Sequence, residues 1–256
     1  MFHRISLPQQ VDVVVASFGG VGTTFLCDFL AEFRRTNNSV DADGLKHSPL
    51  PPITRNPAAR FVYVYGDPID AVVSLFGRGF HTEQSRKLQR YADGTRIIPR
   101  DMTLDEYAQA GRDQFLLERH FRNWYSTWLR QPTLFLRYET VFANQQALID
   151  FLELPARALD QFPQKRERRS RAAELPPATR DALQRMYGDF QGQLNAIGDA
   201  EVRIPKESSP QPSWSVPEYR RAIAAQYSPH NILRSFWESS LRSHWKRLSG
   251  NTARSQ

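Results

Sequence analysis

The stretch Val11-Asp-Val-Val-Val-Ala-Ser-Phe-Gly-Gly-Val-Gly-Thr-Thr24 decides the fold that we expect for this chain. Its first half is a short β-branched run, and nearly continuous hydrophobicity of this kind is typical of a parallel strand buried on both faces. A helix should follow over Thr23–Phe33, because apolar residues recur there at helical spacing. This order predicts a phosphate-binding turn over Ser17–Thr24, since backbone N–H groups and the helix dipole favour an anion there. The alternative is an ordinary strand-to-helix turn without a ligand.

The rest of the chain alternates strands with helices in the same way. We predict strands over Arg60–Tyr65 and Thr133–Arg137, each followed by a helix. Helices are predicted over residues 69–76, 115–129, 145–154 and 177–197. A further short helix should begin at the capping box Thr103-Leu-Asp-Glu106. Strands that alternate with helices predict an α/β fold, here a three-layer α/β/α arrangement with a central parallel sheet of the P-loop nucleotide-binding type.

Other segments are expected to be irregular or to stand apart. Residues 37–57, rich in Asn, Asp, Gly and Pro, should cross the top of the sheet without regular structure, and residues 82–100 should form a polar loop. Regular structure should weaken beyond Gly198. We therefore expect one α/β domain over residues 1–198, followed over residues 199–256 by a Pro- and Ser-rich segment and a C-terminal helix. That part would pack on the domain or mediate assembly, for example into a homodimer.

The net positive charge of the chain favours an anionic partner but does not indicate which one. The 34 Lys and Arg residues outnumber the 27 Asp and Glu residues, and the net charge of +7 suits a nucleotide, a sulfated sugar, nucleic acid or a lipid headgroup. The basic residues are dispersed, and their one cluster, Lys165–Arg171, is more typical of a solvated face than of a nucleic-acid interface. We therefore expect no nucleic-acid partner.

Cysteine content and hydropathy indicate the compartment. Cys27, most simply a buried small apolar residue, is the only cysteine, which excludes an intrachain disulfide and a cysteine-based zinc site and fits a reducing compartment. No stretch approaches the ~18 consecutive apolar residues of a membrane span. We expect a cytoplasmic protein without a metal, although a fragment cut from a longer anchored protein would look the same.

Five short motifs occur along the chain in a fixed order. They are Ser17-Phe-Gly-Gly-Val-Gly-Thr-Thr24, His47-Ser-Pro49, Gly66-Asp67-Pro68 with Ser74, Phe121-Arg-Asn-Trp124, and Phe135-Leu-Arg-Tyr138-Glu139. Over about residues 11–198 the chain resembles the sulfotransferases that use 3'-phosphoadenosine 5'-phosphosulfate (PAPS). Their first loop typically reads Ser-Tyr-Pro-Lys-Ser-Gly-Thr-Thr, and a His-x-Pro segment carries their catalytic base. Their second strand leads into Arg-Asp-Pro with a Ser eight residues beyond the Arg, and an aromatic helix precedes a strand that ends in Tyr-Glu.

The resemblance implies sulfuryl transfer from PAPS, or a related nucleotide, to a hydroxyl or amine of a small-molecule or carbohydrate acceptor, without a metal. His47 would deprotonate the acceptor, with Lys46 beside it as a second catalytic residue. The turn would hold the 5'-phosphosulfate, Ser74 the 3'-phosphate and Tyr138 the base. The implied donor-binding residues are Gly19, Gly20, Val21, Gly22, Thr23, Thr24, Ser74 and Tyr138.

Several residues of these motifs also have a purely structural interpretation. Asp67 is expected to cap the second helix, and Trp124 and Trp128 to pack in the core. His47 is open to interpretation as a loop histidine without chemistry, and Tyr138 as a core residue at a strand end. A Walker A loop is disfavoured, because the turn lacks that motif's lysine, and with it a magnesium-dependent NTPase.

Two departures from the family pattern bear on activity. Gly20 replaces the loop lysine, which in the family contacts the bridging oxygen and the sulfuryl group, and Gly66 replaces the arginine that binds the 3'-phosphate. Each loss removes a charge-assisted hydrogen bond worth about 1.5–3 kcal/mol. Candidate replacements, each more typical of a solvated surface charge, are Lys46, Arg55, Arg78, Arg169 and Arg171. The alternatives are therefore a catalytically inactive nucleotide- or anion-binding protein on the same scaffold, and a transferase that uses a different nucleotide donor.

Overall fold

One mixed sheet lies at the centre of the molecule. The computed structural model describes residues 11–52, 54, 56–90, 96–125, 131–165 and 172–205. Within them the spatial strand order is β1-β2-β3-β4, with β1 (Val13–Ala16), β2 (Arg60–Tyr65), β3 (Thr133–Arg137) and β4 (Ala200–Arg203). The first three strands run parallel, as predicted, whereas β4 is antiparallel to β3.

Strand β4 corrects the prediction that regular structure weakens beyond Gly198. It pairs with β3 from Ala200 opposite Leu136 to Arg203 opposite Thr133, so the sheet continues past residue 198. The strand is short, and none of its residues is fully buried. It has no run of apolar residues like those of the other three strands, which is why the sequence pattern did not predict it. Most of the segment 199–256, including its predicted helix, lies outside the described residues.

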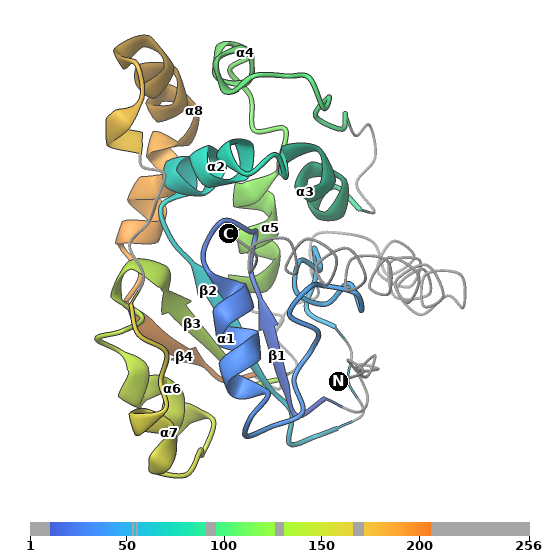
Figure 1. Ribbon diagram of the computed structural model, residues 1–256, viewed down its shortest axis with the longest axis vertical. Coiled ribbons are helices and arrows are strands. Elements are labelled where there is room, and N and C mark those ends of the chain that lie inside the picture. Colours follow the sequence, from blue (N-terminus) through green and yellow to red (C-terminus); the bar gives the residue numbers. More distant parts are fainter. Residues whose placement is uncertain are drawn as a thin grey trace, which may run out of the picture.

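Helices cover both faces of the sheet, which confirms the three-layer prediction. Figure 1 shows α1 (Thr23–Leu30), α6 (Gln145–Phe151) and α7 (Arg157–Asp160) on the near face and α5 (Leu117–Tyr125) on the far face. Side chains alternate between the two faces of a strand, and Tyr63 of β2 points toward α5. Its ring centroid lies 5.7 Å from that of Phe121 and 5.3 Å from that of Trp124. The core prediction for Trp124 is confirmed, whereas Trp128 lies outside the described residues.

Further helices lie beyond the carboxyl edge of the sheet, at the top of Figure 1. They are α2 (Pro68–Gly77), α3 (His81–Leu88), α4 (Leu104–Gln109) and α8 (Pro177–Asn195), with short 3-10 turns at η1 (Tyr138–Thr140) and η2 (Ala172–Glu174). Two predicted helix starts are confirmed. Asp67 caps α2, because its Oδ1 accepts hydrogen bonds from the N–H groups of Ile69 and Asp70 at 2.8 and 2.9 Å, and Thr103 and Glu106 form the capping box of α4.

Helix α3 contradicts the predicted loop over residues 82–100. Its buried residues are His81, Gln84, Ser85 and Leu88, which have helical spacing but are mostly polar. A polar buried face produces no hydrophobic periodicity, and the sequence therefore favoured a loop. The polar ones form hydrogen bonds with the neighbouring backbone: Ser85 Oγ, for example, accepts a hydrogen bond from the N–H of Ile98 at 3.1 Å.

The strand register brings three predicted site segments to one edge of the sheet. Ala16 at the end of β1 lies opposite Tyr63 of β2, which lies opposite Phe135 of β3. Each strand end is followed directly by one of these segments: β1 by Ser17–Thr24, β2 by Gly66 and β3 by Tyr138. They therefore lie at the carboxyl edge, where open α/β sheets bind their ligands.

Candidate functional site

The glycine turn at the end of β1 has a left-handed backbone at three positions. The φ angles of Gly19, Gly20 and Gly22 are 96°, 75° and 70°, a region that residues with a side chain rarely adopt. Ser17 Oγ accepts a hydrogen bond from the N–H of Gly19 at 3.0 Å and lies 3.3 Å from Thr23 Oγ1. Gly22 is the N-cap of α1 and has no side chain that could cap the helix. The N-terminus of α1 therefore presents only backbone groups to the glycine turn.

Neighbouring elements pack against the glycine turn so closely that side chains are excluded. A Cβ atom at Gly20 would lie 2.7 Å from the carbonyl oxygen of Ala71 in α2, and one at Gly19 would lie 2.6 Å from Gln84 Nε2 in α3. Gln84 Nε2 also donates a hydrogen bond to the carbonyl of Phe18 at 3.0 Å. The place of the family's loop lysine is thus closed by α2, and that lysine could not be accommodated without movement of the backbone.

Lys46 brings a cation to this turn from another part of the chain. Its Nζ donates hydrogen bonds to Thr24 Oγ1 at 2.8 Å and to the carbonyl of Ser39 at 2.5 Å. The side chain is buried, so the interpretation of Lys46 as a solvated surface charge was wrong. Burial lowers the pKa of Lys46. An ammonium group has three donors, and the two protein acceptors leave one N–H of Lys46 for a further partner.

His47 lies against the start of the same turn. Its Nδ1 is 2.9 Å from the carbonyl oxygen of Ser17, and the N–H of Ser17 donates back to the carbonyl of Lys46 at 3.0 Å. A carbonyl only accepts, so Nδ1 carries the proton and Nε2 holds the lone pair in the neutral ring. Burial lowers the pKa of His47 to about 3, which keeps the imidazole neutral and its Nε2 able to accept a proton at neutral pH.

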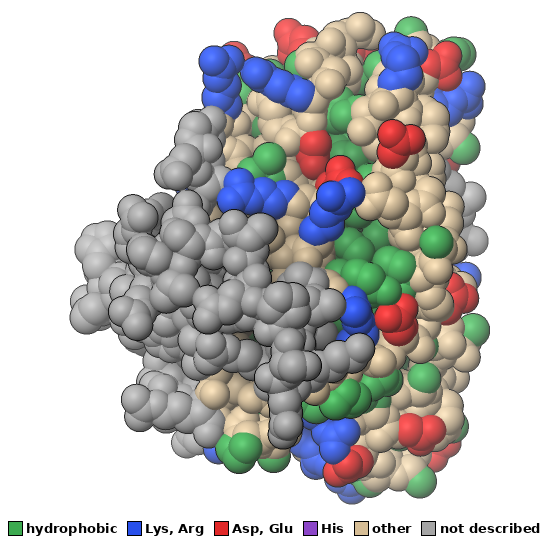
Figure 2. Space-filling model, turned by 180° about the vertical axis from the view of Figure 1, so that it is seen from behind, with side chains coloured by type: hydrophobic (Ala, Val, Ile, Leu, Met, Phe, Trp, Pro, Cys, Tyr) green, Lys and Arg blue, Asp and Glu red, His purple; other side chains and the backbone are tan. Residues whose placement is uncertain are grey.

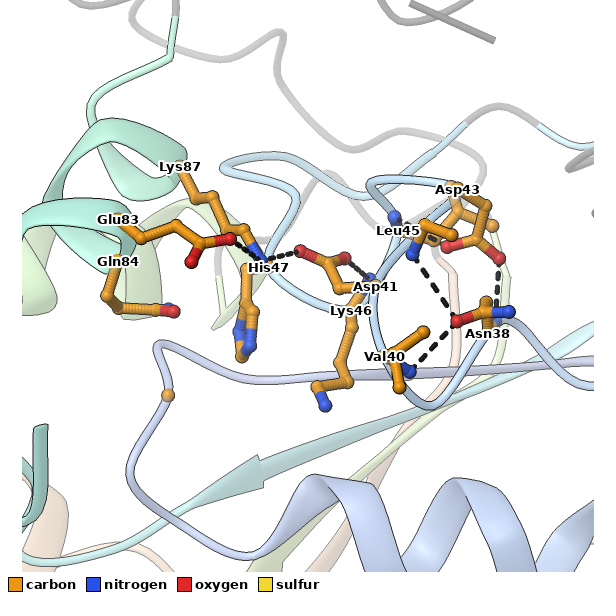
Figure 3. A network of polar contacts seen from close by, with 12 residues as sticks. Asn38, Val40, Asp41, Asp43, Leu45, Lys46, His47, Glu83, Gln84 and Lys87 are labelled. Atoms are coloured by element: carbon orange, nitrogen blue, oxygen red, sulfur yellow. Dashed lines mark hydrogen bonds and ion pairs between the residues drawn. The ribbon is translucent and has the colours of Figure 1, made fainter. Parts of the chain in front are cut away.

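A buried carboxylate holds the segment that carries Lys46 and His47. Asp41 Oδ1 accepts a hydrogen bond from the N–H of Lys46 at 3.0 Å, and its Oδ2 lies 2.8 Å from Lys87 Nζ of α3. Figure 3 shows this arrangement, with the Lys46 and His47 side chains extending away from Asp41 in the same direction. Burial opposes ionisation of Asp41, but the charge and hydrogen bond of Lys87, together with the charge of Lys46, act against it, and the pKa of Asp41 lies below its ordinary value.

A second carboxylate turns the backbone just before Lys46. Asp43 Oδ2 accepts a hydrogen bond from the N–H of Asn38 at 2.6 Å, and its Oδ1 accepts from the N–H of Leu45 at 3.1 Å. Burial raises the pKa of Asp43 to about 7. These hydrogen bonds between side chains and the backbone take the place of regular secondary structure, and residues 38–50 of the predicted irregular excursion form a largely buried loop.

Helix α5 holds the other end of this loop. Trp124 Nε1 donates a hydrogen bond to the carbonyl of Ser48 at 2.8 Å, and Asn123 Nδ2 donates to the carbonyl of Pro49 at 3.0 Å. The sequence did not indicate these roles, nor those of Asp41, Gln84 and Lys87. Such residues act through contacts between distant segments, for which a single sequence carries no local signal.

A carboxylate lies at the end of β2. A Cβ atom at Gly66 would lie 2.7 Å from Glu139 Oε1, and the same oxygen accepts a hydrogen bond from the N–H of Asp67 at 3.0 Å. The preceding residue, Tyr138, is half-buried, and its ring lies against Gly22 so closely that a Cβ atom there would collide with it. The structure therefore brings Tyr138 to the glycine turn and a carboxylate to Gly66.

Ser74 and Arg78 lie further along α2. Ser74 is half-buried, one helical turn beyond Ala71, which packs on Gly20. Its carbonyl accepts a hydrogen bond from Arg78 Nε at 3.0 Å, and the Arg78 guanidinium lies 5.4 Å from the ring centroid of Phe80. These contacts fix Arg78 at the end of its own helix. The other candidate cations, Arg55, Arg169 and Arg171, lie outside the described residues.

Comparison with known proteins identifies the family of this site. The family model of the sulfotransferase domain matches residues 44–173. The chain belongs to the sulfotransferase domain family. No curated protein and no solved structure matches it. The part that matches the sulfotransferase domain contains Lys46, His47, Gly66, Ser74 and Tyr138, and it begins after the glycine turn.

The surface of this sulfotransferase-family chain shows mixed charge on one face. On the described part of the face in Figure 2, Lys and Arg side chains are interspersed with Asp and Glu, and hydrophobic side chains gather between them. No described helix is long and apolar enough to cross a membrane. Within the described ranges, no three His, Cys, Asp or Glu side chains are grouped so that they could hold a metal ion.

Proposed function

We propose that the chain is an active sulfotransferase, which transfers a sulfuryl group from PAPS or a related nucleotide to a hydroxyl or amine acceptor. The proposed acceptor is a small molecule or a carbohydrate. The observation that carries this proposal is the 2.8 Å hydrogen bond from Lys46 Nζ to Thr24 Oγ1. It supplies a cation at the first turn of α1, next to a glycine turn in which Gly20 has replaced the usual lysine.

The reaction that fits this arrangement is an in-line displacement at sulfur. His47 Nε2 takes the proton from the acceptor while the acceptor oxygen or nitrogen forms a bond to sulfur. The bond between sulfur and the bridging phosphate oxygen breaks, and its electron pair stays on that oxygen. Lys46 and the N–H groups of the glycine turn stabilise the charge that develops there. The products are the sulfated acceptor and the nucleotide phosphate, and the proton remains on His47.

The low pKa of His47 is compatible with this role. With a pKa of about 3 the ring is unprotonated over the neutral range, which a base requires. A bound phosphosulfate adds negative charge nearby and raises the pKa of the imidazole in the complex. The positive charge of Lys46 acts in the opposite direction, because it lowers the pKa of His47.

The inactive-scaffold alternative is less well supported than catalysis. An inactive scaffold would be expected to have no basic side chain within reach of the glycine turn. Lys46, however, donates a hydrogen bond to Thr24 in the first turn of α1. The alternative of a different nucleotide donor gains support from the end of β2, where a carboxylate lies beside Gly66.

The proposal extends to location and assembly. We infer a cytoplasmic location, because the chain has a single cysteine, Cys27, and therefore cannot form an intrachain disulfide. The segment over residues 199–256 begins with β4, which belongs to the sheet, and we propose that the rest of it packs on the domain or mediates a homodimer. Light scattering of the full chain and of a chain that ends after residue 205 tests the second option.

A transfer assay tests the function directly. The chain is incubated with PAPS or with adenosine 5'-phosphosulfate, each carrying radioactive sulfur, and with a mixture of hydroxyl and amine acceptors. We expect labelled acceptor, and a rate about 100-fold lower for Lys46→Met, since removal of one donor to a developing anion has this effect. The exposed Lys165 provides the matched control Lys165→Met, which should leave the rate unchanged. The proposal is wrong if neither donor is bound at millimolar concentration and neither transfers its label.

A further inference from the structure

The carboxylate of Glu139 takes up the space beside Gly66 at the end of β2. A Cβ atom at position 66 would lie 2.7 Å from Glu139 Oε1 and 3.0 Å from Oε2. The hydrogen bond from the N–H of Asp67 to Oε1, at 3.0 Å, holds the carboxylate over the strand end. Position 66 thus has no side chain of its own and is lined by an acceptor from the neighbouring strand.

This place lies on the path that a nucleotide would take from the glycine turn. Strand β2 stands between β1 and β3, and Tyr138, whose ring lies against Gly22, directly precedes Glu139. Ligands of open α/β sheets lie across the carboxyl ends of the strands. A nucleotide with its 5'-phosphosulfate in the glycine turn therefore brings its ribose to the ends of β2 and β3, where Glu139 lies.

The chemistry of a carboxylate distinguishes between two forms of ribose. An ionised carboxylate only accepts hydrogen bonds, and a free ribose hydroxyl is a donor. A phosphate monoester is largely dianionic at neutral pH and offers acceptors and negative charge. In dinucleotide-binding sites, an acidic residue accepts a hydrogen bond from a free ribose hydroxyl, whereas an arginine binds a phosphorylated one.

We propose that the donor site of this chain selects a nucleotide with free ribose hydroxyls, such as adenosine 5'-phosphosulfate, over the 3'-phosphorylated PAPS. The proposal rests on the proposed sulfotransferase function and names its donor. Glu139 is the specificity-determining residue, because its carboxylate accepts a hydrogen bond from the ribose. Gly66 is the residue that leaves room for that carboxylate.

Calorimetric titration with two desulfated nucleotides tests the donor choice. Adenosine 5'-monophosphate and adenosine 3',5'-bisphosphate differ only in the 3'-phosphate. We expect the full chain to bind the monophosphate at least about tenfold more tightly, the effect of one hydrogen bond to a charged group. Glu139→Gln keeps an oxygen for the N–H of Asp67 and removes the charge, and it should bring the two affinities to within about twofold of each other.

A second glutamate gives a matched control. Glu153 is paired with Arg60 at the beginning of β2, the end of the strand opposite to Gly66. Glu153→Gln should leave the preference for the monophosphate unchanged, because the same charge is removed far from the ribose.

The outcomes separate this proposal from the proposed function. Tighter or equal binding of the bisphosphate by the unmodified chain overturns the donor choice and leaves a PAPS-dependent sulfotransferase standing. A preference for the monophosphate that Glu139→Gln does not reduce overturns the role of Glu139. Failure of both nucleotides to bind at millimolar concentration overturns the nucleotide site, and both proposals with it.

Discussion

Two glycines in this sulfotransferase-family chain stand where the PAPS sulfotransferases that it resembles carry a cation, and their surroundings differ. At Gly20 the backbone is left-handed and packed on Ala71, and Lys46 reaches the same turn from another segment. At Gly66 the nearest side chain is the carboxylate of Glu139. The loss of a motif residue therefore has two different structural outcomes in this chain. Near Gly20 a cation reaches the turn from another segment, and at Gly66 a carboxylate lies where the family pattern has a cation.

The largest effect is expected when the family's lysine is put back into the turn. Gly20→Lys should lower the free energy of unfolding by about 2–5 kcal/mol, from left-handed strain and from overpacking against Ala71. Gly79 has a similar φ of 67° but no atoms within 4 Å of a Cβ atom, so Gly79→Lys should show the strain alone, about 1–2 kcal/mol. Urea unfolding of both variants measures the difference. Equal losses would mean that the turn can accept the lysine.

The next effect concerns the ion pair that holds the Lys46 loop. Lys87→Met leaves the Asp41 carboxylate, 2 % exposed, without its partner at 2.8 Å, and should lower the free energy of unfolding by about 2–4 kcal/mol. The control Glu83→Gln weakens the 3.6 Å ion pair between Glu83 and Lys87, which are four residues apart on α3, and should change the free energy of unfolding by less than about 0.5 kcal/mol.

The same variant should change the acid sensitivity of the fold. The folded-state pKa of Asp41 lies below its ordinary value, so its contribution to stability is present above the unfolded pKa of about 4 and is lost as the pH falls through the folded pKa. Without Lys87 the pKa of Asp41 rises, and the variant should lose stability at a higher pH than the unmodified chain. Identical acid profiles would contradict the account of Asp41.

A change of stability with pH is also expected from His47. Burial lowers its pKa from 6.5 to about 3, so the unfolded state binds the extra proton between these values. Stability should therefore rise with pH across this window and be lost as the pH falls through it. In His47→Gln, whose amide can still donate to Ser17, the slope should decrease by up to about 1.4 kcal/mol per pH unit. An unchanged slope between pH 4 and about pH 6 would show that His47 titrates normally.

The smallest effect on stability is expected at the end of β2. Glu139 is exposed, and in Glu139→Gln an amide oxygen can still accept from the N–H of Asp67. Thermal unfolding should show a change of less than about 0.5 kcal/mol. A loss above about 1 kcal/mol would mean that the carboxylate is a structural group, and the contrast between a fixed region at Gly20 and a replaceable one at Gly66 would fail.

Local patterns predicted most of the fold. The buried strand Val13–Ala16, the cap at Asp67 and the capping box at Thr103 each depend on neighbouring residues, and each is confirmed. Helix α3 and strand β4 were missed for related reasons. The buried face of α3 is polar, and β4 is a short strand that is never fully buried, so neither has the hydrophobic pattern on which such predictions rest.

The candidate site could be predicted only in part. Sequence identified Lys46, Gly20 and Gly66 as positions that matter, but not their surroundings. Lys46 reaches Thr24 across 22 residues, through a loop whose path is set by Asp41 and Lys87. Such a path results from tertiary contacts, and no spacing rule encodes it. The approach of Glu139 to Gly66 likewise depends on the pairing of β2 with β3.

In the proposed donor site, Lys46 supplies the charge that Gly20 cannot. Adenosine 5'-phosphosulfate and adenosine 5'-monophosphate differ only in the sulfuryl group, so the ratio of their affinities measures how strongly the site holds that group. Calorimetric titration of the unmodified chain and of Lys46→Met compares this ratio. We predict that the unmodified chain prefers the phosphosulfate about tenfold, and that the variant has no preference. An equal preference in both proteins would contradict the account.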